Sequence, residues 1–483
     1  MLKYYCISIC IIFISLLSAY SIDETLMEIS IEKEAMARDN VLCENKIAEL
    51  RNNDPDFLPQ DMFESDIKYL MRICKSAPKI IAIRDQYIKP HLENLNCLRK
   101  TIIGIEDIKI ELDSYDANTE KYSLFITSEK YPHLNCRALL SIPSDEARFL
   151  YENFDKFVYV ACGYISYDDT IAISYIDIYN LKEDPICHYE VDTLKPYYFY
   201  SDFSYSDFSY DGEIFACSNN KSVYVLKTLP DSTICLYKNN FPNKINCISL
   251  SPEGKYLAVG AYGIEPTKKD FWLINVQTKE VIFSESFDGG IYSVDISPDG
   301  RLVAVGGGFS YTNSDARIYD IETGKMLWDF SGYECIKGVK FSPNQKYIAN
   351  IGKELNVYDL TTLDKVINVS TSNCFFALDF SPDSNILVVG GQYEGFAFYD
   401  MNSKMLTNSY ENNKHVYSLS FDFTGKLLAV GYEDLKIISL KGMSYEQEYK
   451  TFGGLYKPGS IYVVSHGKAY ISFHPNSAGF EDY

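Results

Sequence analysis

The sequence predicts an all-β propeller of seven or eight four-stranded blades, preceded by a small α-helical segment. A line of similar residues recurs along most of the chain at roughly 40 to 45 residues, which is the period of a four-stranded propeller blade. Tyr and Phe are abundant, at 41 and 28 of 483 residues, and aromatic side chains suit pleated, half-buried strands. The first 100 residues lack the repeat and instead space their apolar residues as a helix does.

The clearest copy of the repeat runs over residues 293–306 and reads SVDISPDG-RLVAVG. Its first strand opens on a small residue and then alternates apolar and polar positions, the pattern of a half-buried strand. Pro298 and Gly300 suit the following turn, because Pro fixes φ and Gly accepts positive φ. The second strand is almost wholly apolar, as expected between two blades. Equivalent copies open at Cys247, Gly338, Ala377 and Ser418, with weaker ones near Ser206 and Phe157.

A third strand is predicted in every repeat, and in three of them it contains Tyr-Asp, at residues 319–320, 358–359 and 399–400. These strands are expected at residues 176–181, 223–227, 271–276, 317–321, 355–360, 396–401 and 435–440.

With these features, residues 136–445 resemble a WD40-like β-propeller repeat protein of the YVTN/quinoprotein-like superfamily. The third strand of WD40 repeats typically ends in Trp-Asp, which Tyr-Asp replaces here, and the Gly-His that often opens a blade is missing. The resemblance implies the propeller architecture, while the buried His–Asp–Ser–Trp network of many members is expected to be absent or altered.

The number of blades stays open between seven and eight. Seven repeats look complete, and the first of them is expected to open at residues 138–142. Two strand-like pieces from each end could form a composite eighth blade and close the ring, which would remove exposed sheet edges. These pieces are residues 108–112, 122–127, 461–464 and 469–473.

Three domains are expected: a signal peptide (1–21), an α-helical segment (22–100) and the propeller (101–483). In the helical segment, one helix should end at Asp54-Pro55, a second should cover residues 61–75, and a third should open at Pro78 and be kinked or ended by Pro90. Its apolar faces should pack on each other or on the propeller. A partner-binding or dimerising role is the alternative.

The first 21 residues resemble an export signal. Lys3 precedes an uncharged, largely apolar stretch, and Ala19 and Ser21 are small residues at the usual positions before a cleavage site. We therefore expect an extracytoplasmic protein (secreted, periplasmic or in the secretory-pathway lumen) without membrane insertion after cleavage. An uncut anchor is the alternative.

Charge and cysteines limit the partners and the covalent framework. A net charge of −21 disfavours nucleic acid. Of the 13 cysteines, Cys162 and Cys217 occupy strand positions and are expected to be buried thiols. The disulfide candidates are Cys43, Cys74, Cys97 and Cys136. Glycosylation sequons begin at Asn220 and Asn368, and they matter if the source is a eukaryote.

The chain carries no G-x-S-x-G elbow, P-loop, H-E-x-x-H or paired C-x-x-C motif. We therefore expect no catalytic residue, no metal and no cofactor, and the acids of the turns and of Tyr-Asp are expected to cap the backbone. The prediction is a non-enzymatic interaction scaffold that binds a protein or peptide, possibly a basic one. The alternatives are a lactonase-like or glycan-processing propeller enzyme that uses carboxylates at the channel mouth, and a bacterial envelope-assembly factor.

One set of residues is predicted to bind the partner. The connection from the second to the third strand carries an aromatic residue in most repeats, accompanied by acids, and Tyr-rich surfaces are common in binding hot spots. The alternative is that these rings pack against adjacent hairpins. The candidates are Tyr164, Tyr167, Tyr262, Phe309, Tyr311, Tyr393, Tyr432, Asp169, Glu265, Asp315, Glu394 and Glu433.

Overall fold

The computed structural model describes the chain between residues 22 and 473 and divides it into two compact units. Unit 1 holds residues 1–40 and 89–195, and unit 2 holds residues 41–88 and 196–483. The predicted signal, residues 1–21, lies outside the described residues, so export stays a prediction. The other residues left undescribed are 101–102, 106–107, 119, 132–135, 142–143, 154–156, 166–170, 181–184, 191–204, 230–231, 264–268, 288, 310–312, 331–335, 394, 411–413, 423, 433–434, 442–443, 453–457, 465–467 and 474–483.

Unit 1 combines helices with two sheets. The helix α2 (Ile22–Asn53) contributes its first part, and His91 of α4 (Lys89–Lys100) lies between Glu32 and Asp39 of α2, with nitrogen–oxygen distances of 2.5 and 3.0 Å. One sheet has three strands, β2 (Lys109–Asp116), β3 (Lys121–Thr127) and β4 (Cys136–Ser141). The other has the order β1 (Ile103–Ile105), β5 (Phe157–Ile165), β6 (Ile171–Asn180) and β7 (Pro185–Glu190).

The earliest repeat near Phe157 belongs to unit 1, which corrects its expected place as the first blade of the ring. Its expected opening strand at residues 138–142 falls in β4, which pairs with β3, and α5 (Ser144–Asn153) follows it in place of the usual turn. The composite eighth blade is likewise not formed, because β2 and β3 pair with each other in unit 1 and β32 pairs with β33 in unit 2. The expected limits 22–100 and 101–483 therefore do not coincide with the two units.

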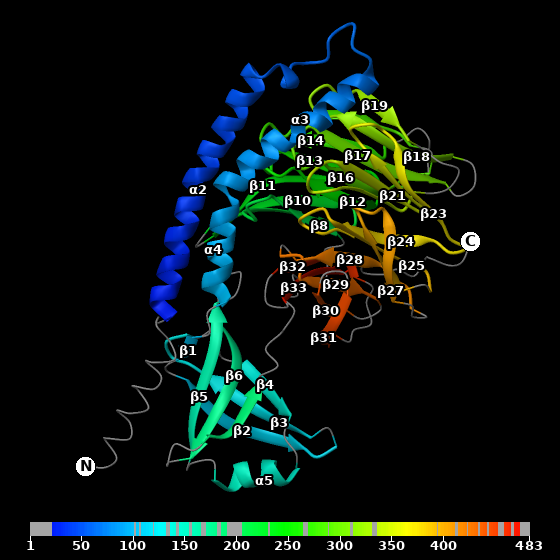
Figure 1. Cartoon of the computed structure of the whole chain (residues 1–483). Helices are drawn as coiled ribbons and strands as arrows, with labels where there is room; N and C mark the ends of the chain where they lie inside the picture. Colours follow the sequence, from blue (N-terminus) through cyan, green and yellow to red (C-terminus); the bar gives the residue numbers. More distant parts are fainter. Residues whose placement is uncertain are drawn as a thin grey trace. The chain divides into compact units, whose positions relative to one another are not determined.

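Unit 2 contains six four-stranded antiparallel blades and a two-stranded sheet (Figure 1). The blades are β8–β11 (Tyr205–Phe208, Ile214–Asn219, Ser222–Leu229, Ser232–Asn240), β12–β15 (Ile245–Leu250, Tyr256–Ala261, Phe271–Asn275, Val281–Glu285), β16–β19 (Ile291–Ile296, Leu302–Phe309, Asn313–Asp320, Met326–Asp329), β20–β23 (Gly338–Phe341, Tyr347–Ile351, Glu354–Asp359, Lys365–Ser370), β24–β27 (Phe375–Phe380, Ile386–Gly391, Phe396–Asp400, Met405–Tyr410) and β28–β31 (Ser418–Phe421, Leu427–Gly431, Leu435–Lys441, Ser444–Phe452). The two-stranded sheet is β32 (Pro458–Val464) and β33 (Lys468–Phe473).

The inner strands of these sheets form a closed ring. Each first strand contacts the first strand of the next blade, from β8 through β12, β16, β20, β24 and β28 to β32, and β32 contacts β8 again. The described part of unit 2 is therefore a propeller of seven sheets, in agreement with the predicted fold. Between the sheets lie cores of Val, Ile, Leu and aromatic side chains, such as the one around Phe271 and Tyr319.

The turn residues act as the sequence predicts. Gly254 and Gly300 have φ of 68° and 74°, which explains the glycine after the Ser-Pro-acid sequence in these two copies, and Ser384 has φ of 60° at the same position. Asp299 accepts a hydrogen bond from Ser297 Oγ at 2.7 Å, and Asp383 does the same with Ser381. In the Tyr-Asp pairs, Asp359 accepts from the amide of Thr361 at 2.9 Å. These carboxylates cap turns.

The helices differ from the prediction at both prolines. Pro78 lies inside α3 (Asp66–Tyr87) and does not open a new helix, whereas Pro90 lies in the first turn of α4, where its missing N–H costs nothing. A proline inside a helix removes one backbone bond of the preceding turn. In that turn the carbonyl of Ile73 accepts a bond from Arg301 of the propeller at 2.7 Å, so tertiary contacts support the helix there.

The cysteines also depart from the prediction. Cys43, Cys74 and Cys97 form no disulfide among the described residues, and the first two are buried. The side chain of Cys136 is not described. Cys217 is buried, as predicted, whereas the side chain of Cys162 lies outside the described residues. Among the helices that are described, none has the length and apolar composition needed to cross a bilayer.

Candidate functional site

The propeller has two chemically different ends, which we call the turn end and the connection end. Strands in a blade are antiparallel, so the turns after first and third strands, such as residues 251–255 and 276–280, lie at one end. The links after second strands and between blades lie at the other. Any partner of the propeller must approach one of these ends or the outer edges of the blades.

Part of the turn end is covered within unit 2 by α3. The apolar face of α3 contributes Tyr69, Leu70, Ile73 and Cys74 to one core with side chains of β17–β21, and α3 contacts β19 (Figure 1). At the edge of this core, Tyr69 donates a hydrogen bond to the buried Asp320 at 3.1 Å. The helix α3 therefore forms part of the propeller unit.

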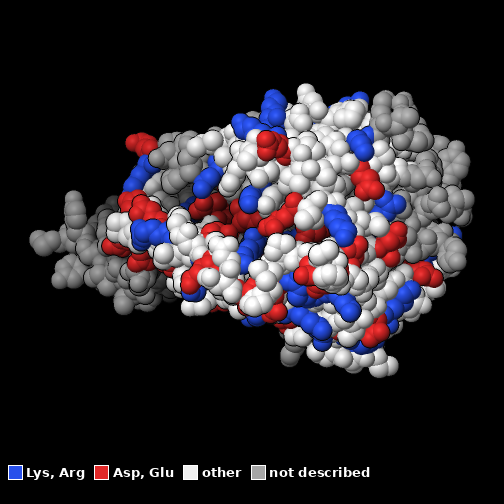
Figure 2. All heavy atoms as spheres, turned by 90° about the horizontal axis from the view of Figure 1, so that it is seen from above, with Lys and Arg blue, Asp and Glu red and all other residues white. Residues whose placement is uncertain are grey.

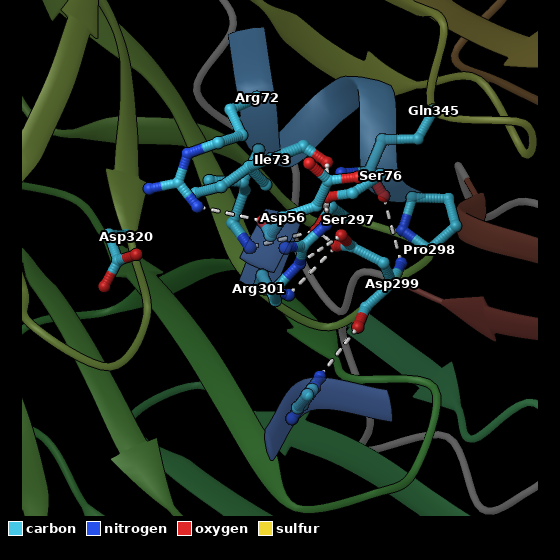
Figure 3. A network of polar contacts seen from close by, with 12 residues as sticks. Asp56, Arg72, Ile73, Ser76, Ser297, Pro298, Asp299, Arg301, Asp320 and Gln345 are labelled. Carbon is cyan, nitrogen blue, oxygen red and sulfur yellow. Dashed lines mark hydrogen bonds and ion pairs between the residues drawn. The ribbon is translucent and has the colours of Figure 1, made fainter. Parts of the chain in front are cut away.

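A polar network centred on Arg301 fastens α3 to the third complete blade (Figure 3). Arg301 pairs with Asp299 at 2.6 Å and donates to the carbonyl of Ile73 and to Ser76 Oγ at 2.7 and 2.8 Å. Asp299 is fully buried; burial opposes its ionisation, yet Arg301 and Ser297 hold the pKa of this carboxyl below its usual value. The Asp299 amide in turn donates to Gln345 of the next blade at 3.0 Å.

Other bonds extend the attachment to neighbouring blades. Arg84, which is almost fully buried, donates to the carbonyl of Pro298 at 2.5 Å and pairs with Glu253 at 3.0 Å. Asp85 accepts from Tyr210 of the first complete blade at 2.8 Å. A single helix thus links the turns of three successive blades, and a ligand could reach these three turns only by displacing buried side chains.

The connection end carries an aromatic cluster, defined here as Phe376, Tyr393, His415 and Tyr417. The rings of Tyr393 and His415 lie 4.1 Å apart, and those of Phe376 and Tyr417 are nearly parallel at 6.3 Å. Tyr393 is 55% exposed and has φ of 58°, a left-handed backbone that is rare for a bulky residue. Backbone outliers of this kind gather at functional sites, so the cluster is a candidate binding surface.

The first strands of the blades carry a second group of side chains, which we call the inner polar row: Asp207, Ser249, Asp295, Lys340, Asp379 and Ser420. Four of its members accept a hydrogen bond from the backbone of the next blade. The acceptor and amide pairs are Asp207 with Leu250 (2.7 Å), Ser249 with Ile296 (3.1 Å), Asp295 with Phe341 (2.7 Å) and Asp379 with Phe421 (2.8 Å). The row satisfies amides that have no sheet partner on the inner edge.

Lys340 is the member of the inner polar row that carries a cationic hydrogen-bond donor, whereas Asp207, Ser249, Asp295 and Asp379 act as acceptors. Its ammonium lies 3.3 Å from Asp295 Oδ1. Burial raises the pKa of Asp295 to about 6, although Lys340 and the Phe341 amide oppose the shift. Burial also raises the pKa values of Asp207 and Asp379, with Lys340 again opposing. Among the described members, one cation therefore faces three carboxylates.

The comparisons with known proteins agree with this architecture. Residues 279–320, which run from the end of one blade through the third strand of the next, match the family described as WD40: WD domain, G-beta repeat. The chain carries a WD40-like β-propeller. No curated protein matches the chain.

The structure describes only part of the predicted binding set on this WD40-like propeller. Tyr262 and Tyr393 are exposed on the connection end, whereas Tyr432 is buried in the core between two blades. Phe309, Asp315 and Tyr164 lie in described strands, but their side chains are not described. The predicted residues outside the described part are Tyr167, Asp169, Glu265, Tyr311, Glu394 and Glu433.

The two sequons lie on exposed residues. Asn220 occupies a tight turn between β9 and β10 with φ of 47°, and Asn368 lies in β23, where its amide donates to Asn356 Oδ1 at 2.6 Å. Glycosylation of either residue stays a prediction.

Sequence reasoning missed most of the aromatic cluster and the whole inner polar row. Both occupy fixed positions of the repeat, so the aligned copies contained the signal. In each copy, the residue just before the small opening residue of the first strand is Asn246, Tyr292, Lys337, Phe376 or Tyr417. The residue two positions after that opening residue is polar and belongs to the inner polar row.

The charge on the described surface is uneven. In the view from above, acidic side chains gather in a hollow near the middle, with Lys and Arg side chains around it (Figure 2). Across the described residues, no group of three or more His, Cys, Asp or Glu side chains has an arrangement that could hold a metal ion. The net charge of −21 is thus partly collected in local patches.

Proposed function

We propose that this protein is an exported, non-enzymatic interaction scaffold whose partner binds the connection end of the propeller. One observation carries the proposal: α3 occupies part of the turn end through buried bonds, whereas Tyr393 presents an exposed ring on left-handed backbone at the opposite end. A rigid aromatic side chain offers contact area at low entropic cost, which suits a binding hot spot.

The partner is proposed to be a protein or peptide with a basic segment. Its cationic side chains would contact the rings of the aromatic cluster, since Lys and Arg bind the faces of Tyr and Phe. The inner polar row adds attraction, because its three carboxylates are only partly neutralised by Lys340. The fit is therefore electrostatic as well as steric.

The proposal predicts that Tyr393→Asn abolishes capture of the partner. Asn adopts left-handed backbone readily, so the variant removes the ring without straining the loop. Loss of a hot-spot aromatic costs 2 kcal/mol or more, so Kd should rise about 30-fold. The measurement is affinity capture from native extract with the full chain, read by quantitative mass spectrometry, followed by titration of the captured protein.

The matched control is Tyr151→Asn, which removes an exposed tyrosine from α5 of unit 1. A partner lost by Tyr393→Asn and kept by Tyr151→Asn supports the proposal. A partner that binds the parent and Tyr393→Asn with equal affinity contradicts the assignment of the connection end. A captured set without basic segments contradicts the proposed partner class.

A further inference from the structure

Two carboxylates interrupt the buried face of α2 within unit 1. Ile29 and Met36 are buried on this face, and Glu32 and Asp39 follow them by three residues each, so all four side chains lie on one side of the helix. The side chains of Glu32 and Asp39 are only 21% and 41% exposed. A carboxylate that is partly withdrawn from water needs a hydrogen-bonding or charged partner. For both carboxylates this partner is His91 of α4.

His91 meets the two carboxylates with different ring nitrogens. Nδ1 lies 2.5 Å from Glu32 Oε1, and Nε2 lies 3.0 Å from Asp39 Oδ2. An ionised carboxylate only accepts hydrogen bonds, so both bonds form together only when both ring nitrogens carry a proton. The imidazolium meets this condition, whereas the neutral ring has one donor and one acceptor. The geometry therefore fits the charged form of His91.

We propose that His91 is a proton-dependent latch between α2 and α4 of unit 1. The charged ring donates to Glu32 and to Asp39 and joins α4 to two successive turns of α2. After the ring loses a proton, one nitrogen becomes an acceptor that faces a carboxylate oxygen, so one of the two bonds is replaced by repulsion. The two helices are therefore held more tightly in mildly acidic than in mildly alkaline solution.

The sign of the effect follows from the balance of forces on the ring. Burial opposes the charge on His91, but the hydrogen bonds to Asp39 and Glu32 outweigh it and raise the pKa of His91 above its usual value of 6.5. The folded protein thus holds this proton more strongly than the unfolded chain. The stabilisation by the latch is complete below about pH 6.5 and is lost as the pH rises through the pKa of the folded state.

The surroundings of the ring add no competing charge among the described residues. Asn94 of α4, which does not titrate, donates to the same Glu32 oxygen at 3.4 Å. The other charged residues of this part of α4, Lys89 and Glu93, are exposed and form no ion pair with the ring. The helix α4 also contacts β5, where the described side chains, at residues 163 and 165, are Gly and Ile. Glu32 and Asp39 therefore control the titration of His91.

Hydrogen exchange of the full chain tests the latch directly. Amide protection of residues 89–100, corrected for the intrinsic exchange rate and read by mass spectrometry, should be about 10-fold lower near pH 8.5 than near pH 6, since one charge-assisted hydrogen bond is lost. In His91→Gln the protection should be the same at both pH values, because Gln carries no charge. The matched control is Asn94→Ala, which removes the other contact with Glu32 and should keep the 10-fold difference.

Nuclear magnetic resonance of the histidine-labelled full chain gives a second measurement that does not depend on the packing of His91→Gln. The resonance of His91 should titrate above pH 6.5 in the parent, and Asp39→Asn should lower the midpoint, because the amide keeps the shape of the side chain but removes its charge. A midpoint at or below 6.5 in the parent overturns the proposal. So does protection of residues 89–100 that is equal at the two pH values in the parent.

Discussion

Replacing Arg301 by Met is expected to lower the free energy of unfolding by about 3–5 kcal/mol, because it leaves the carboxylate of Asp299 buried without its partner. The same change removes the donor to Ile73 and Ser76, so α3 loses its central attachment to the propeller. The loss should be largest at neutral pH. As the pH falls, the cost should shrink, because burial without Arg301 raises the pKa of this carboxyl and lets it take up a proton.

Chemical denaturation followed by circular dichroism measures this loss, and limited proteolysis of residues 58–65 reports whether α3 has detached. Lys325→Met is the matched control, since Lys325 joins the same blade to Asp66 of α3 at an exposed position and should cost much less. The double variant Asp299→Asn/Arg301→Met should recover part of the loss. A variant Arg301→Met that is as stable as the parent would show that the network does not hold α3.

Asp295→Asn is expected to have the second largest effect, a gain in the free energy of unfolding that depends on pH. Asp295 titrates near 3.8 in the unfolded chain and near 6 in the folded protein. Below the lower value both states are protonated and the group contributes nothing. Between the two values the folded state keeps a proton that the unfolded state has lost, so stability falls as pH rises. Relative to the parent, the variant should therefore gain about 2–3 kcal/mol between about pH 3.5 and pH 7.

The measurement is the difference in unfolding free energy between variant and parent at several pH values. Ser249→Ala is the control, because Ser249 makes the same inner-edge bond to the next blade but has no titrating group in this range. Its difference from the parent should not change with pH. A flat profile for Asp295→Asn would mean that water in the ring solvates the carboxylate as well as bulk solvent does.

The propeller could be predicted from sequence because each blade repeats its own signals. The alternating first strand, the Ser-Pro-acid-Gly turn and the apolar second strand all act locally, and Gly254 and Gly300 adopt the positive φ that the turn predicts. The repeat near Phe157 was wrongly predicted to be the first blade, because its sequence contains only part of the blade pattern. Residues 157–163 read as a second strand, but α5 and β1 surround them in place of the turn and first strand of a blade.

The site was less predictable, since it depends on which end of the propeller stays open. The contacts of α3 with Glu253, Arg301 and Asp320 join residues that are far apart in the chain, and no local pattern reveals them. Tyr393 was predicted from the connection that carries it, whereas its neighbour His415 comes from the next blade. The burial of Tyr432 depends on packing between blades, which spacing along one repeat does not report.

The attachment of α3 has a consequence for the order in which the molecule assembles. The bonds of Arg301 to Ile73 and of Asp320 to Tyr69 close loops of 228 and 251 residues. When α3 leaves the ribosome, the turns that will cover its apolar face have not been synthesised. Contacts between such distant residues form slowly, so the helix spends the earliest part of folding with Leu70 and Ile73 exposed. The cell must protect this helix until the third complete blade is made.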